Sequence, residues 1–276
     1  MKYPKEMISG KDINLTSDNL GIIKQLTIDD FMGDIDIFDF IKPFFVVRIW
    51  DVNGLLNESI KPLTMYLVSA LKQSELYESL VRSLSMIYRT NIIKLVPEGD
   101  TFTILIKYIS EDVLGNVLDE LNRRNIKVTD EDIEKAMDRN ADPIAIISDD
   151  NFNTLAKAMM EMCHYEDPEP QQDDEYEGDS ELVKLAMEAE RKHEEAERKK
   201  NALTFEEIVR QVYHMKRCTY DDIKHLTLWQ LQDTYQTYCI MDNNEKEWQL
   251  ASSGNFKINL KNIKDWKRET KTSRDN

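Results

Sequence analysis

The chain of 276 residues has few of the features that mark several common protein classes. Its three cysteines, Cys163, Cys218 and Cys239, are too few and too scattered for a disulfide framework or a four-thiolate zinc site. Eight glycines and seven prolines favour a helix-rich chain over a turn-dense β protein. There is no run of about 18 apolar residues, so we expect no transmembrane helix. Residues 1–11 lack an apolar h-region, so we also expect no signal peptide.

Motifs for catalysis and for cofactor binding are also missing. The sequence has no GxGxxG, no phosphate loop and no GxSxG. Cys163 and His164 are neighbours, but adjacent side chains diverge on a helix, and no second pair at metal-ligand spacing accompanies them. Residues 173–184 resemble a calcium loop, but its last position is Lys184, where a bidentate Glu is needed. We therefore predict a protein that is not an enzyme and binds no metal or cofactor.

Charge is distributed unevenly along the chain, whose formal net charge is −16. Residues 1–165 hold 18 basic and 27 acidic residues, and residues 166–199 hold 5 and 14, so each part contributes −9. Residues 200–276 hold 13 and 11, a balance of +2. An acidic chain repels phosphate backbones, which argues against general nucleic-acid binding.

Composition and charge together predict three segments. Residues 1–165 are apolar-rich and are expected to form an N-terminal helical domain with a small sheet. Residues 166–200 begin with prolines and acids and continue with charged pairs four residues apart, which predicts an acidic linker and a charged helix. Residues 201–276 are expected to form a small all-α domain. The predicted fold class is α+β and predominantly α-helical.

Apolar spacing and turn residues predict the elements of the N-terminal segment. Helices are expected over residues 38–49, with an interruption at Pro43, and over residues 63–71, 76–88, 113–121 and 152–160. Strands are expected at residues 13–15 and 21–24, and as a hairpin of residues 92–96 and 101–106 around a turn at 97–100. Further helix starts are expected at Thr27, Thr129 and Ser148.

The C-terminal segment repeats one helix-start device three times. Thr204, Thr219 and Thr227 each precede, by three residues, an acid or Gln that can reach back to the backbone N–H of the threonine. These boxes predict three short helices within about 40 residues, enclosing a small core. Ser252-Ser253-Gly254 is expected to end the helical pattern, and residues 258–266 form a mildly basic final element.

Aromatic side chains are the candidates for a partner-binding patch. An aromatic residue at helical spacing is more often a core residue, and only exposed ones would form such a patch. The candidates are Phe44, Phe45, Trp50, Trp229, Tyr235 and Trp266.

Four stretches and one tryptophan resemble a known family. Residues 21–30 (GIIKQLTIDD) resemble a short strand that leads into a helix, and residues 149–152 (DDNF) resemble the start of a middle helix. Residues 203–209 (LTFEEIV) and 226–231 (LTLWQL), with Trp266, resemble a C-terminal helical domain. Together they resemble the tail assembly chaperones of long-tailed, siphovirus-like phages of Gram-positive bacteria.

The resemblance implies a non-enzymatic protein of the host cytoplasm. Members of this family escort the tape measure protein and help to recruit tail tube subunits, and they often occur as a short and a long form made by ribosomal frameshifting. The acidic linker is where we expect a binding domain to join a recruiting domain. Partner binding needs no catalytic constellation, which fits the missing motifs.

Two other functions stay open. The first is a virion structural protein, such as a tail or head–tail connector component, which purified particles would retain. The second is a nucleic-acid-binding regulator that uses the basic C-terminal residues. A helix-turn-helix reading is disfavoured because the candidate recognition helix, residues 228–238, carries no Lys or Arg for contacts with bases or phosphates.

Overall fold

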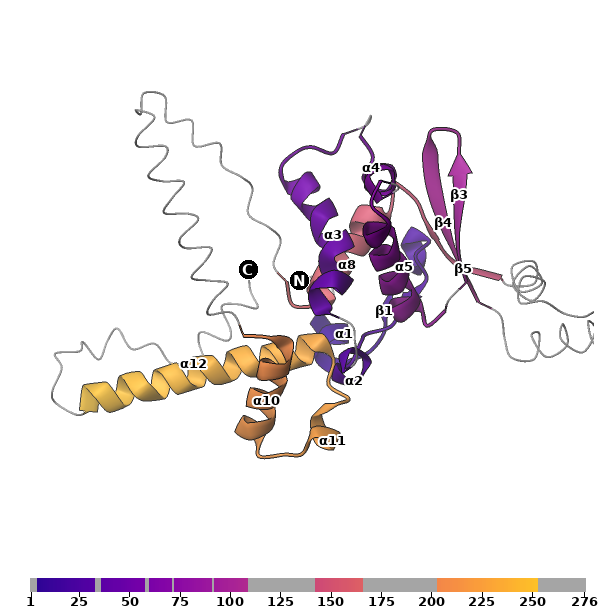
Figure 1. Ribbon diagram of the computed structural model, residues 1–276. Helices are drawn as coiled ribbons and strands as arrows, with labels where there is room; N and C mark the ends of the chain where they lie inside the picture. Colours follow the sequence, from indigo (N-terminus) through magenta and orange to yellow (C-terminus); the bar gives the residue numbers. More distant parts are fainter. Residues whose placement is uncertain are drawn as a thin grey trace, which may run out of the picture.

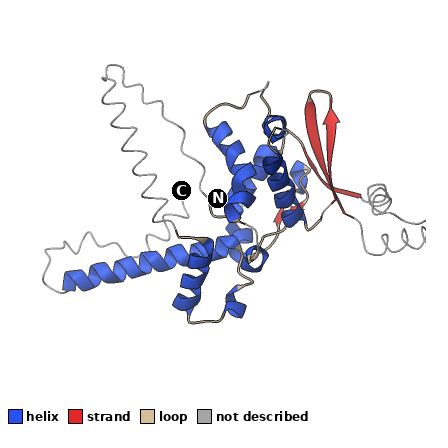
Figure 2. Cartoon of the chain, in the orientation of Figure 1, coloured by secondary structure: helices blue, strands red, loops and turns tan. Residues whose placement is uncertain are grey.

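A computed structural model describes residues 4–32, 36–57, 60–70, 72–90, 92–108, 142–165 and 203–252. The helices of its N-terminal region are α1 (Pro4–Ser9), α2 (Ile28–Phe31), α3 (Ile37–Val52), α4 (Pro62–Ala70), α5 (Ser74–Tyr88) and α8 (Phe152–Met162). Its strands are β1 (Ile13–Asn14), β2 (Ile22–Ile23), β3 (Ile92–Glu98), β4 (Thr101–Tyr108) and β5 (Asp142–Ile147). The C-terminal helical unit contains α10 (Phe205–Lys216), α11 (Tyr220–Ile223) and α12 (Leu228–Ser252). The predicted fold class, α+β and mostly helical, is confirmed (Figures 1 and 2).

The N-terminal core lies between α3, α5 and α8, which pack together beside the larger sheet (Figure 1). Apolar residues recur on these helices at intervals of three and four, so each presents one apolar side to the others. Phe44 of α3 and Phe152 of α8 are fully buried, with ring centroids 6.2 Å apart. The predicted helices over residues 63–71, 76–88 and 152–160 are thus confirmed as α4, α5 and α8.

The predicted interruption at Pro43 is wrong, because α3 runs through this residue. Proline has no N–H to donate, so the carbonyl of Asp39, four residues earlier, loses its helical partner. The hydroxyl of Ser79 on α5 donates a hydrogen bond to that carbonyl, and the hydroxyl of Ser83 donates to the carbonyl of Phe40 at 2.8 Å. A neighbouring helix therefore replaces the bond that the proline removes.

The predicted hairpin is confirmed as β3 and β4, which pair in antiparallel register from Ile92 with Lys107 to Glu98 with Thr101. The turn is tighter than predicted, with Pro97 inside β3 and Gly99 at φ +63°. Strand β5, which the sequence reading missed, pairs antiparallel with β4 and completes a three-stranded sheet. The two short strands expected near the N-terminus pair with each other as β1 and β2.

All three predicted capping boxes of the C-terminal unit are present. Thr204 and Glu207, Thr219 and Asp222, and Thr227 and Gln230 make the expected bonds at the starts of α10, α11 and α12. The prediction of three short helices is wrong for the last of them, because α12 is 25 residues long. It ends at Ser252, where the predicted break begins.

Other predicted elements lie outside the described residues. These are the helix over 113–121, the helix start at Thr129, the acidic linker and charged helix of 166–200, and the basic element of 258–266. The domain boundaries proposed at residues 165 and 200 adjoin or fall within the range 166–202, which the structure does not describe. The three-segment division therefore stays a prediction.

Candidate partner-binding surface

The described residues provide no metal centre. Among them, no group of three or more His, Cys, Asp or Glu side chains lies close enough together to hold a metal ion. In the same ranges, no helix combines the length and the apolar character needed to cross a membrane. Burial raises the pKa of the Cys163 thiol, which disfavours the thiolate form that a nucleophile requires. The adjacent His164 ring lies against the indole of Trp229, with ring centroids 5.5 Å apart, so the geometry lends no support to a catalytic Cys–His pair.

The N-terminal region and the C-terminal helical unit are joined by a short backbone pairing. The N–H of Ile28 donates to the carbonyl of Leu226 at 2.9 Å, and the N–H of Leu228 donates to the carbonyl of Leu26 at 3.1 Å. Thr27 and Thr227 face each other in an antiparallel bridge between these two bonds. Two helix-start motifs 200 residues apart in the sequence therefore pair with each other. In each motif, the N–H of the residue after the cap threonine and the carbonyl of the residue before it bond to the other motif.

Side chains cross the same junction in both directions. Ile28 of α2 is fully buried in the small C-terminal core with Val209, Val212, Ile223 and Leu231. In return, Trp229 at the start of α12 is buried in the N-terminal core. Each core is therefore partly built from the other region, which fixes where α12 begins and in which direction it runs.

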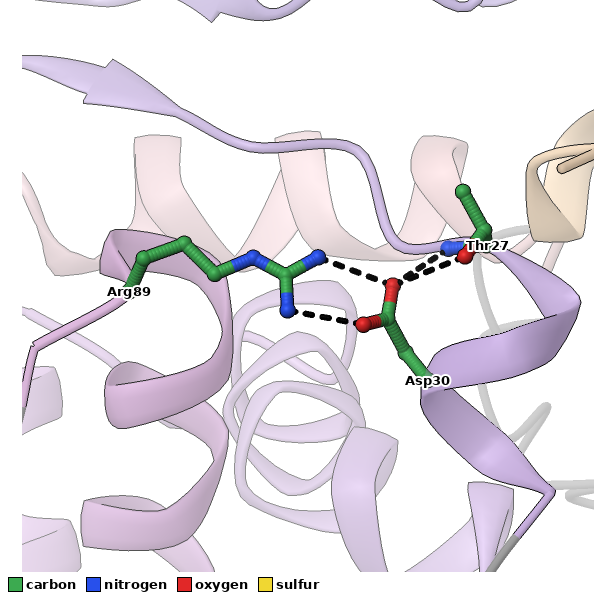
Figure 3. Close-up of polar contacts among 3 residues, drawn as sticks. All are labelled: Thr27, Asp30 and Arg89. Carbon is green, nitrogen blue, oxygen red and sulfur yellow. Dashed lines mark hydrogen bonds and ion pairs between the residues drawn. The ribbon is translucent and has the colours of Figure 1, made fainter.

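An ion pair fixes α2, and with it the junction, to the N-terminal core. Asp30 accepts hydrogen bonds from two nitrogens of Arg89, at 2.7 and 2.9 Å, and from the N–H and hydroxyl of Thr27, at 2.8 and 3.0 Å (Figure 3). Partial burial opposes the charge of Asp30, but the hydrogen bonds from Arg89 and Thr27 outweigh it and lower the pKa of Asp30. The carboxylate thus serves at once as the cap of α2 and as the partner of α5.

From this junction, α12 extends past α10 and away from the N-terminal region (Figure 1). Its first part packs on the two cores, whereas almost every side chain from residue 241 onward is exposed. Met241, Trp248 and Leu250 are 38%, 49% and 45% exposed. Met241 and Trp248 are seven residues apart and therefore lie on one face of the helix. Large apolar side chains on a projecting helix are typical of a protein-binding surface.

The structure separates the predicted partner-binding residues by burial. Phe44 and Trp229 are buried in the N-terminal core, and Phe45 and Trp50 are half-buried against it. For these four, the observed position is the core alternative that the sequence left open. They form no exposed patch in this arrangement.

The two remaining predicted residues belong to the C-terminal part. Tyr235 is half-buried against the small core, and Trp266 lies outside the described residues. Sequence reasoning missed Trp248, which is the most exposed tryptophan that the structure describes. The seven-residue interval between Met241 and Trp248 is typical of two residues on one helix face. It was not used, because the helix that begins after Thr227 was expected to be short.

Comparison with known proteins identifies one part of the chain. The family model of the YomV second domain matches residues 197–271, a range that contains α10, α11 and α12. YomV is a prophage-associated protein family of Bacillus. No curated protein and no solved structure matches the chain. The C-terminal helical unit is thus similar to a prophage-encoded domain, which suggests a phage-related or prophage-related protein.

Proposed function

We propose that the protein is a phage tail assembly chaperone, a non-enzymatic factor that binds the tape measure protein and recruits tail tube subunits in the host cytoplasm. The observation that carries this proposal is the match of residues 197–271 to a domain of a prophage-associated family. The resemblance of residues 21–30 and 149–152 to tail assembly chaperones supports it from outside the matched range.

The exposed part of α12 supports a function in protein binding. A face that bears Met241 and Trp248 offers a flexible thioether and a large aromatic ring, both of which are enriched at protein interfaces. An amphipathic helix of a client can bury such a face by packing alongside α12. We therefore assign the tape measure protein to this face.

The junction supports a scaffold that keeps its two regions in a fixed relation. Leu26 to Ile28 and Leu226 to Leu228 exchange backbone bonds, and Trp229 is buried in the N-terminal core. A client bound on α12 would therefore be held at a defined place relative to the N-terminal region, from which a second protein can be recruited.

Affinity capture from phage-producing cells tests this function. The tagged full-length chain is expected to co-purify with the tape measure protein, and the double variant M241A/W248A is expected to lose most of it. The matched control is N243A/Q249A, which alters two exposed polar residues of the same helix and should capture as much client as the unchanged chain.

Two results would contradict the proposal. One is capture without any tape measure protein. The other is retention of the protein in purified virions at a fixed copy number, which would identify a structural component of the particle.

A further inference from the structure

We propose that residues 256–268 of the same chain, the C-terminal segment, cover the distal half of α12 (residues 241–252) in the free protein. This inference rests on the proposed function, because it concerns the same face of α12 to which the tape measure protein is assigned. Its test uses the protein without any client, so the two proposals can fail separately. A client that uses this face would have to displace the C-terminal segment.

The distal half of α12 has the exposed apolar surface that such an occupant would bury. Met241 and Trp248 lie on one face, and Leu250 lies on the opposite side. A helix that exposes large side chains along two to three turns is stabilised when another segment packs against it.

The sequence of the C-terminal segment has a matching apolar pattern. Four of its five large apolar residues follow one another at intervals of four, three and three, which places them on one side of a helix: Phe256, Leu260, Ile263 and Trp266. The fifth, Ile258, would lie on the other side. The family match supports a common unit, because it ends at residue 271 and so includes both α12 and the C-terminal segment.

Charge complementarity supports the same pairing. Residues 241–252 hold three acids and one lysine, a balance of −2, whereas residues 256–268 hold five basic residues and one acid, a balance of +4. Lys246 is paired with Asp242 at 2.5 Å, and Glu245 accepts a hydrogen bond from the side-chain amide of Gln249 at 3.2 Å. Glu245 and Glu247 are the acids nearest to Trp248 in the sequence. Opposite charges on facing segments favour docking at low and physiological salt.

The connection between the two segments has a suitable length. Three residues, Ser253, Gly254 and Asn255, separate the end of α12 from Phe256. Connections of about two to five residues join antiparallel helices. An antiparallel return would place Leu260 near Trp248, because equal numbers of residues separate these two from the connection. It would place Trp266 within one residue of the position opposite Met241. The short tether also gives the segment a high effective concentration at this face.

Hydrogen exchange of the full-length chain, followed by mass spectrometry, tests the inference. The double variant L260D/I263D is expected to exchange amides in residues 241–252 about ten-fold faster than the unchanged chain, because the covering segment is released. The matched control, T272D/S273D, adds the same charge further along the chain and should leave these amides unchanged. Exchange in α10 serves as the reference for intact folding of the unit.

A second measurement uses the unchanged protein. A zero-length carbodiimide crosslinker is expected to join Glu245 or Glu247 to Lys261 or Lys264 within monomers, at any protein concentration. Equal exchange in L260D/I263D and the unchanged chain, or absence of these crosslinks, would overturn the proposal. Crosslinks found only in dimers, or protection that disappears on dilution, would overturn it in favour of a second copy of the chain.

Discussion

The N-terminal region and the C-terminal helical unit differ in how far each can supply its own core. The N-terminal core spans α3, α4, α5, α8 and the larger sheet, and most of its buried residues come from that region. The C-terminal core that the structure describes has five buried residues, and one of them, Ile28, comes from the N-terminal region. A core of this size buries too little apolar surface to stabilise a fold alone, so the C-terminal unit depends on the junction.

Among the substitutions that test this comparison, replacing Trp229 should cause the largest loss in free energy of unfolding. The W229A change removes a buried indole from the N-terminal core and is expected to cost about 4 kcal/mol in free energy of unfolding. Urea denaturation of the variant measures the loss. N243A is the control, because this exposed polar residue lies on the same helix and its cost should stay within about 0.5 kcal/mol. Equal costs for W229A and N243A would contradict the burial of Trp229 in the N-terminal core.

The I28A variant should destabilise the C-terminal helical unit more than the N-terminal region. Ile28 is fully buried in the C-terminal core, so truncation is expected to cost about 3 kcal/mol. Because the cavity lies in the small core, amide exchange should rise in α10 and α11 well before it rises in α3 or α8. Uniform acceleration in both regions would show that the C-terminal unit does not open separately.

The S79A variant tests the hydrogen bond from Ser79 to the carbonyl of Asp39, which compensates for the helical bond that Pro43 cannot make. Removing the hydroxyl leaves the carbonyl of Asp39 without its donor, at an expected cost of about 1 kcal/mol in free energy of unfolding. S74A on the same helix is the comparison, since its hydroxyl makes none of the contacts described for Ser79. A smaller loss for S79A than for S74A would argue that α3 tolerates the proline without help.

The smallest expected effect is the pH dependence that Asp30 contributes. Its pKa is lower in the folded protein than in the unfolded chain, so its stabilisation is complete above the unfolded pKa of about 4 and is lost as the pH falls through the folded value. Because Arg89 is half exposed and the pair is screened by solvent, we expect about 1 kcal/mol at neutral pH. D30N should show this loss at pH 7, and the loss should shrink as the pH falls below about 4.

The control for that experiment is D150N, which alters an exposed carboxylate in a loop before α8. It should follow the pH profile of the unchanged protein. A difference between D30N and the unchanged protein that stays constant as the pH falls would mean that the carboxylate acts through shape and not through its charge.

Local signals in the sequence were enough to predict that most of the helices and strands exist, but not how long each of them is. The threonine boxes at residues 204, 219 and 227 predicted three helix starts because a cap is a contact between residues three apart. Strand β5 was missed because it contains Pro143, which is unfavourable in a strand, and because its isoleucines at 144 and 146 are exposed. Its pairing partner, β4, is separated from it in the sequence by residues 109–141. The length of α12 was missed because its distal half lacks an apolar stripe facing a core.

The sequence predicted the type of residue expected at a partner-binding surface, but not where in the structure such residues are exposed. Sequence reading selected aromatic residues as partner contacts, but it had no means to decide which of them are buried. Phe44 and Trp229 enter a core through contacts with residues far away in the chain, whereas Trp248 lies beyond the last packing partner of α12. Exposure depends on what covers a side chain, and that is a property of the tertiary structure.

The sequence by itself determined the helix starts at Thr27, Thr204, Thr219 and Thr227, the hairpin, the fold class and the absence of known catalytic motifs, because each depends on residues close together in the chain. Only the tertiary structure decided that α3 continues through Pro43, that Leu26 to Ile28 pairs with Leu226 to Leu228, and that α12 projects with Trp248 exposed. Each of these depends on a contact, or on the lack of one, between segments that are distant in sequence, and local pattern carries no information about it.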